Sequence, residues 1–141
     1  MKHGDFQETV ARIVDEDPRY HEAAYQFMRE ALDFTIKLLE KPVEGKGRHV
    51  SGGELLEGIR QFALKDFGPL TLTVLRTWGI TRCEDFGEIV FNMVRHGVLG
   101  KTDEDRREDF AGGYDFDTAF RKPFRPRTRA VAAGELPGSL A

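Results

Sequence analysis

The sequence has few of the residues from which most metal sites and thiol chemistry are built. Cysteine occurs once, at Cys83, and histidine occurs four times. A single cysteine excludes an intrachain disulfide and a thiolate-rich metal site. The histidines lack metal-ligand spacing, and the zinc-protease pattern HExxH is absent; they are His3, His21, His49 and His96. We therefore expect neither a metal site nor a cofactor.

Long apolar runs are also missing. No run approaches the roughly 18 to 20 residues that a membrane-spanning helix requires. The first residues, MKHGDFQETV, lack the apolar stretch and cleavage site of a secretory signal, and they contain acids that transit peptides avoid. With 40% hydrophobic and 32% charged residues, the composition is that of a soluble globular protein. We expect a single cytoplasmic domain, since 141 residues can bury one sizeable core but not two.

Apolar periodicity predicts a pair of helices over residues 6–41. The first helix ends near Asp15. Asp17 followed by Pro18 is typical of a helix N-cap with proline in the first turn, so the second helix is expected to start there. Apolar residues cover more than half of the circumference of this second helix, which indicates a core position.

Residues 51–96 predict three further helices joined by tight turns. The first begins at a capping box formed by Ser51 and Glu54. Gly68 ends it, and Pro69 begins the next helix, which is expected to direct four apolar side chains inward: Leu70, Val74, Leu75 and Trp78. The third helix is predicted over about 82–96.

The pattern after this helix is less regular. Val98 and Leu99 are expected to start a short strand, and residues 102–110 fit one or two polar helical turns. Apolar and polar residues alternate over 114–120, as in a half-buried strand. The same residues fit a helix capped by Asp115 or Asp117 nearly as well.

Three helices followed by a β-ribbon have the order of a winged helix. The sequence therefore predicts a mainly α fold, with one helical domain over 1–120. In this domain the helical pair at 6–41 packs on a winged-helix-like core at 51–120. Such tri-helical cores occur both in DNA readers and in protein-interaction modules, so the fold alone does not decide the function.

The start of the helix over 82–96 argues against DNA reading. In a DNA reader this end approaches the bases, but here it carries Arg82 as its single cation beside three acids, Glu84, Asp85 and Glu88. The acids would meet the negatively charged phosphate backbone. We expect Glu84 to form a capping box with Thr81. The three acids are candidate protein-interaction residues.

Cys83 lies at the start of the same helix, where a helix N-terminus can lower the pKa of a thiol. The neighbouring carboxylates of Glu84 and Asp85 oppose this effect. We therefore expect Cys83 to be a small buried or half-buried residue without a catalytic role.

Residues 121–141, RKPFRPRTRAVAAGELPGSLA, predict an extended basic tail outside the domain. Residues 103–117 hold seven acids and two arginines, whereas 121–129 hold five basic residues and no acid: Arg121, Lys122, Arg125, Arg127 and Arg129. This asymmetry is typical of an interaction tail, and equally of a solvated basic end that keeps a protein soluble.

Three long strings in the sequence support a family resemblance. They are DEDPRYHEAAYQFMREAL, HVSGGELLEGIRQFALKDFGPLTLTVLRTWGI and DFGEIVFNMVRHGVLGKTDEDRREDFAGGYDFDTAF. Over roughly residues 6–120 the chain resembles a family of conserved hypothetical proteins named for planctomycete and verrucomicrobial bacteria. The resemblance implies no activity, substrate or cofactor, and no functional residue is carried over from it.

Three functions are compatible with these features. The first is a non-enzymatic cytoplasmic module that binds a protein partner or a second copy of itself. The second is a nucleic-acid-binding protein that uses its basic tail, for which we expect weak and salt-dependent affinity. The third is an enzyme with an unrecognised site, which a pocket lined by Cys83 and a histidine would favour.

Overall fold

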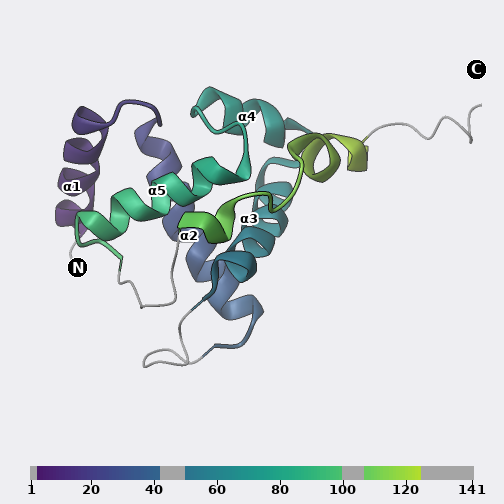
Figure 1. Ribbon diagram of the computed structural model, residues 1–141, viewed down its shortest axis with the longest axis horizontal. Coiled ribbons are helices and arrows are strands. Elements are labelled where there is room, and N and C mark those ends of the chain that lie inside the picture. The colour runs from purple at the N-terminus through teal and green to yellow at the C-terminus, as the bar shows by residue number, and fades with distance from the viewer. Residues whose placement is uncertain (1–2, 42–49, 100–106, 125–141) are drawn as a thin grey trace, which may run out of the picture.

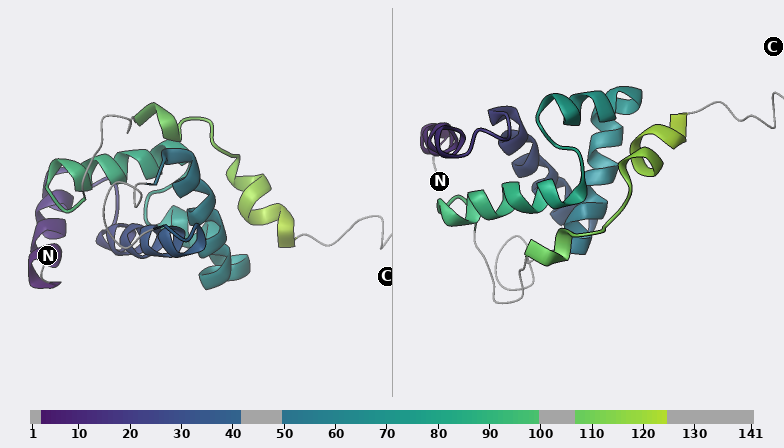
Figure 2. Two further views of the ribbon diagram at one scale, coloured as in Figure 1. Left: turned by 90° about the horizontal axis from the view of Figure 1, so that it is seen from below. Right: turned by 45° about the horizontal axis from the view of Figure 1, so that its top comes forward.

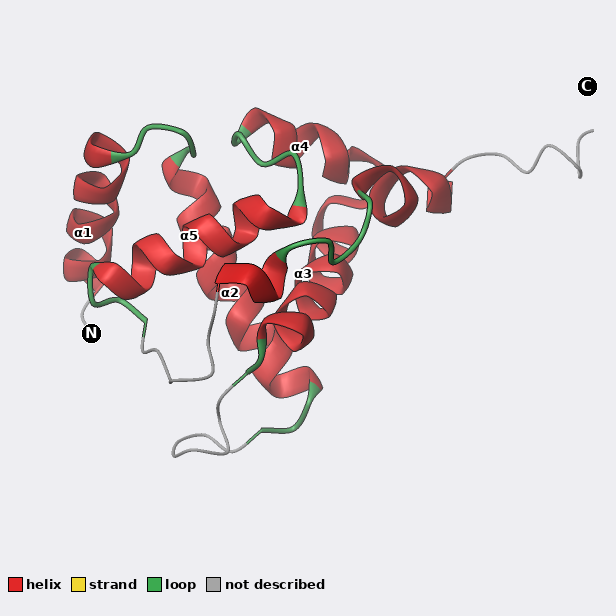
Figure 3. Ribbon diagram, viewed as in Figure 1, coloured by secondary structure: helices red, strands yellow, loops and turns green. Residues whose placement is uncertain are grey.

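The computed structural model describes residues 3–41, 50–99 and 107–124, and every regular element in these ranges is helical (Figures 1 and 3). The five α-helices are α1 (His3–Glu16), α2 (Glu22–Leu38), α3 (Gly52–Phe67), α4 (Thr71–Thr77) and α5 (Cys83–Arg95). Four short helices complete the fold: η2 (Gly68–Leu70), η3 (Arg107–Phe110), η4 (Asp117–Arg121) and η5 (Lys122–Phe124). The expected mainly α class is confirmed. None of the described helices is long and apolar enough to cross a membrane.

The second helix begins later than the sequence indicated. The N-cap of α2 is His21, whose Nδ1 accepts a hydrogen bond from the backbone N–H of Ala23 at 2.9 Å. The carboxylate of Asp17 instead accepts hydrogen bonds from Nε and Nη2 of Arg19, at 2.9 and 2.7 Å. The expectation that Asp17 and Pro18 start the helix was wrong, because Arg19 occupies the oxygens that a cap would need.

The start of α3 agrees with the sequence. Oγ of Ser51 accepts from the backbone N–H of Glu54 at 3.1 Å, and the Glu54 carboxylate accepts from the backbone N–H of Ser51 at 3.0 Å. Further along α3, Gly58 packs against Thr35 of α2, and a Cβ at position 58 would overlap Oγ1 of that buried threonine. A residue without a side chain lets α2 and α3 approach closely at this point.

The side chains that follow Pro69 do not all face the directions predicted from the sequence. The short η2 turn is a 3₁₀ helix, which has about three residues per turn and so rotates the chain differently from an α-helix. Leu75 is buried as expected, but Leu70 is 63% exposed, so its predicted inward position was wrong.

At the core lies α5, which packs against α1, α2, α3 and η3 (Figures 1 and 2). Its side chains of Phe86, Ile89 and Met93 are fully buried. Phe110 of η3 lies against Gly87, where a Cβ would stand 3.0 Å from the Cβ of Phe110. The α5 helix is therefore held in place by packing against four other helices.

Residues 114–120 adopt the helical alternative rather than the strand. Oδ2 of Asp115 accepts from the backbone N–H of Thr118 at 3.0 Å, so it caps the turn that leads into η4. Phe116 and Phe120 are buried and stack edge to face, 5.0 Å apart. Residues 98–99 form a bend rather than the expected strand, and 100–106 lie outside the described residues.

Helical structure continues past the predicted start of the tail. Arg121 is the last residue of η4, and η5 extends to Phe124. The η4 helix packs on α4, at the end of the molecule opposite α1 (Figure 1). Residues 125–141, which hold Arg125, Arg127 and Arg129, lie outside the described residues.

Candidate functional site

The acids at the start of α5 participate in interactions within the fold. The carboxylate of Asp85 accepts hydrogen bonds from the backbone N–H groups of Thr81 and Arg82, at 2.9 and 3.2 Å. It also accepts from the hydroxyl of Tyr20 at 2.6 Å. Asp85 is therefore the capping acid, and the predicted role of Glu84 was wrong. The helix starts one residue later than expected, which moves its third position from Glu84 to Asp85.

Glu88 and Asp17 form a second polar group around Arg19. Nη2 of Arg19 lies 2.7 Å from Asp17 and 3.3 Å from Glu88. Nδ2 of the buried Asn92 donates to Asp17 and to the hydroxyl of Tyr25, both at 3.0 Å. The Arg19 guanidinium holds the pKa of Asp17 well below its usual range. These contacts join the segment between α1 and α2 to α5, so Asp17, Asp85 and Glu88 have a structural role. Glu84 lies 4.0 Å from Arg82, next to it on the surface, and its role in an interaction stays a prediction.

Little of α5 is free for contact with another molecule. Arg95 is its one exposed residue, and the others are buried or half-buried. A recognition helix must present an open face to the DNA groove. Together with the acids at its start, this burial disfavours DNA reading by α5.

Cys83 is inaccessible. Its side chain is 1% exposed, and Sγ lies 3.4 Å from the backbone oxygen of Tyr114. Burial raises the pKa of the Cys83 thiol to about 11, so the thiol is protonated near neutral pH. Nucleophilic catalysis needs an accessible thiolate, and these properties argue against it.

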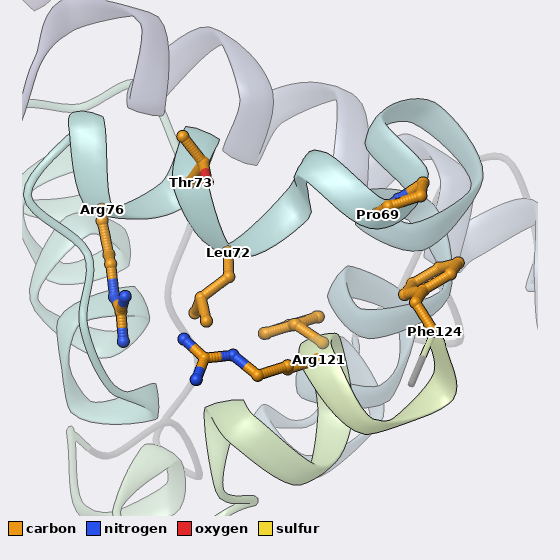
Figure 4. A pocket seen from close by; sticks show the side chains of 7 residues that line it. Pro69, Leu72, Thr73, Arg76, Arg121 and Phe124 are labelled. Atoms are coloured by element: carbon orange, nitrogen blue, oxygen red, sulfur yellow. The ribbon is translucent and has the colours of Figure 1, made fainter. Parts of the chain in front are cut away.

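A groove lies between α4 and the segment formed by η4 and η5 (Figure 4). Its volume is about 280 Å³, and most of the residues that line it are exposed to solvent. Its lining residues are Pro69, Leu72, Thr73, Arg76, Phe120, Arg121 and Phe124. Of the residues named as candidates from the sequence, Arg121 lines this groove and Lys122 is exposed beside it.

The two ends of the groove differ in character. Pro69 and Phe124 lie together at one end, while the guanidinium groups of Arg76 and Arg121 point to the other end, next to Leu72 (Figure 4). Phe124 is 43% exposed, and Leu70, directly after Pro69 in the chain, is 63% exposed. One end is therefore apolar and the other cationic.

The two arginines differ in their ion pairs. Nε of Arg121 lies 3.3 Å from Oδ1 of Asp117, one turn earlier in the same helix. Arg76 is exposed and makes no ion pair with any residue that the structure describes. The cationic end thus carries more positive than negative charge among its described groups.

Sequence reasoning missed this groove because its walls are distant in the chain. One wall comes from residues 69–76 and the other from 120–124. The predicted tail contained a local signal, the aromatic Phe124 between basic residues in RKPFRP, but the facing wall had no recognisable motif.

Comparison with known proteins adds no further assignment. No family model, curated protein or solved structure matches the chain.

Proposed function

We propose that the chain is a non-enzymatic protein-interaction module that docks a partner in the groove between α4 and η4–η5. The observation that carries the proposal is the exposure of Phe124 in the lining of a groove that also holds two arginines. Exposed apolar side chains with a polar rim are typical of binding surfaces. Arginine and aromatic residues are also enriched at protein interfaces.

The helical base of the groove suits this function. Phe120 is 1% exposed and Leu72 is 6% exposed, so the floor is part of the packed fold. A docking surface on packed helices loses little conformational entropy when a partner binds. Arg121 and Lys122 thus serve in the interaction, whereas Asp85 and Glu88 have a structural role.

The proposal includes a winged-helix-like arrangement of α3, α4 and α5, used for protein contact rather than for DNA reading. The order of the three helices supports it, and so does the coverage of α5 by its neighbours. Membership of the planctomycete and verrucomicrobial family, with a cytoplasmic location, is also part of the proposal and adds no activity to it.

Affinity purification from the native host tests this function with two matched variants. Phe124→Glu places a charge in the groove lining, whereas Leu39→Glu alters an apolar residue of similar exposure, 39% against 43% for Phe124, that is outside the lining. The wild type and Leu39→Glu should retain the same partner protein, and Phe124→Glu should lose it. Recovery of the same proteins with all three baits would contradict the proposed docking surface.

A further inference from the structure

The two ends of the groove differ in polarity, and this difference restricts the chemistry of a molecule that binds there. At the Pro69 and Phe124 end, a partner can cover exposed apolar surface, which favours binding. At the other end, the guanidinium groups of Arg76 and Arg121 point to the same region (Figure 4). An occupant must therefore satisfy an apolar end and a cationic end at once.

The cationic end is suited to a carboxylate. A guanidinium carries five N–H donors, and the contact of Arg121 with Asp117 is through Nε. The terminal nitrogens of both arginines reach toward the groove (Figure 4). Guanidinium groups bind carboxylates with paired, charge-assisted hydrogen bonds. A carboxylate placed between them would also reduce the repulsion between two like charges.

The size and shape of the groove favour a peptide over a small molecule. Small-molecule pockets typically measure about 300 to 1,000 Å³ and enclose most of the ligand. This groove is slightly smaller, about 280 Å³, and most of its lining residues are exposed to solvent. Such a volume accommodates one or two side chains of a segment whose backbone stays at the surface. The apolar floor of Leu72 and Phe120 is poorly suited to a phosphate backbone.

On this basis we infer that the groove binds an acidic peptide segment of a partner protein, with one large apolar side chain near an aspartate or glutamate. The apolar side chain lies against Pro69 and Phe124, and the carboxylate binds Arg76 and Arg121. This inference rests on the proposed docking function and specifies the chemistry of the partner.

A random dodecamer peptide library displayed on phage, selected against the full chain, provides the test. Two charge-reversed variants change the net charge equally: Arg76→Glu with Arg121→Glu in the groove, and Arg12→Glu with Lys37→Glu on exposed positions of α1 and α2. Both should keep the unfolding midpoint of the wild type within a few degrees. If the groove pair does not fold, the pair Arg76→Gln with Arg121→Gln replaces it.

The wild type should enrich peptides in which Asp or Glu lies within four residues of Phe, Leu or Trp. The affinity of a synthesised winner should fall at least tenfold in the groove pair and change less than twofold in the control pair. Selection against the groove pair should yield basic peptides in place of acidic ones.

Other outcomes separate the chemistry from the docking function. Neutral or basic peptides that bind the wild type and are lost with Phe124→Glu would overturn the acidic partner while leaving the docking surface intact. Peptides whose binding changes neither with Phe124→Glu nor with the charge reversal, or no enriched peptide, would overturn both the acidic partner and the docking surface. Displacement of the peptides by duplex DNA in a manner that requires Arg76 would assign the cationic end to nucleic acid and contradict the inference.

Discussion

The close approach of α2 and α3 at Gly58 makes a stability prediction that can be worked out from the structure. A Cβ added at position 58 would overlap Oγ1 of Thr35 and lie 2.7 Å from its Cβ and 2.9 Å from its Cγ2. Carbon atoms in contact normally stand about 3.5 to 4.0 Å apart. Thr35 is 0% exposed and its hydroxyl donates to the backbone oxygen of Ala31 at 2.7 Å, so it has no free space into which to move.

Gly58→Ala should therefore destabilise the protein. Overpacking a core typically costs about 1 to 3 kcal/mol, and the Cβ of Thr35 cannot escape by changing rotamer. Replacing a glycine inside a helix by alanine returns about 0.5 to 1 kcal/mol through helix propensity. Because the added Cβ would overlap Oγ1 of Thr35 outright, the overpacking cost should be near the upper end of its range, and the net loss should be about 2 kcal/mol. This corresponds to a fall in Tm on the order of 5 to 10 °C for a chain of this size.

Urea unfolding followed by far-UV circular dichroism measures this loss, and Gly53→Ala is the matched control. Gly53 lies in the first turn of the same helix, and a Cβ added there would have no atom within 4 Å, so its variant should lose no stability. Adding Thr35→Ala to Gly58→Ala removes Oγ1 and Cγ2 but not Cβ, so the pair should show a coupling energy of about 1 kcal/mol. If Gly58→Ala is as stable as the wild type, the helices do not approach as described.

Three further experiments test the polar network around Asp17, the thiol of Cys83 and the C-terminal end of the chain. Asp17→Asn should lower the free energy of unfolding by about 1 to 3 kcal/mol at pH 6 by weakening contacts to Arg19 and Asn92. The pKa of Asp17 in the folded protein lies below its unfolded value of about 3.8, so the stability that the carboxylate contributes is present above pH 4 and is lost as the pH falls further. If the difference in unfolding free energy between the wild type and Asp17→Asn does not shrink on acidification, the pairing with Arg19 is refuted. Cys83 should react with a thiol reagent only as fast as the protein unfolds globally or locally around it. Rapid labelling of the native protein at pH 7 would show that the thiol is accessible and that its pKa is not raised. Removal of 125–141 should leave the unfolding midpoint unchanged but abolish any salt-dependent nucleic-acid binding. Truncation after Phe120 should lower the midpoint because it also removes Arg121 and η5. Equal midpoints for the two truncated proteins would show that η5 adds nothing to the stability of the fold.

The parts of the fold set by neighbouring residues could be predicted from the sequence. The capping box of Ser51 and Glu54 formed as expected because both partners are three residues apart, and local hydrogen bonds of this kind are encoded in spacing. Asp17 shows the limit of such reasoning. Its carboxylate had the spacing of a cap, but it is held by Arg19 and by Asn92, which lies 75 positions away in the chain.

The groove shows why the site was harder to predict than the helices. Its walls meet only after α4 and η4 pack together, and no sequence pattern links Arg76 to Arg121. The exposure of Leu70 also depends on a 3₁₀ turn in place of the expected α-helical start. The acids of α5 were visible in the sequence, but their role in capping and in ion pairs became clear only from the positions of Tyr20 and Arg19.

Hydrogen–deuterium exchange of the full chain, alone and bound to its purified partner, tests the docking surface most directly. If the partner binds in the groove, amide exchange should become slower in residues 69–76 and 117–124. Exchange in α1, which lies at the opposite end of the molecule, should not change (Figure 1). Protection confined to α1 or to the start of α5, with the groove segments unchanged, would contradict the assignment of the groove as the site of interaction.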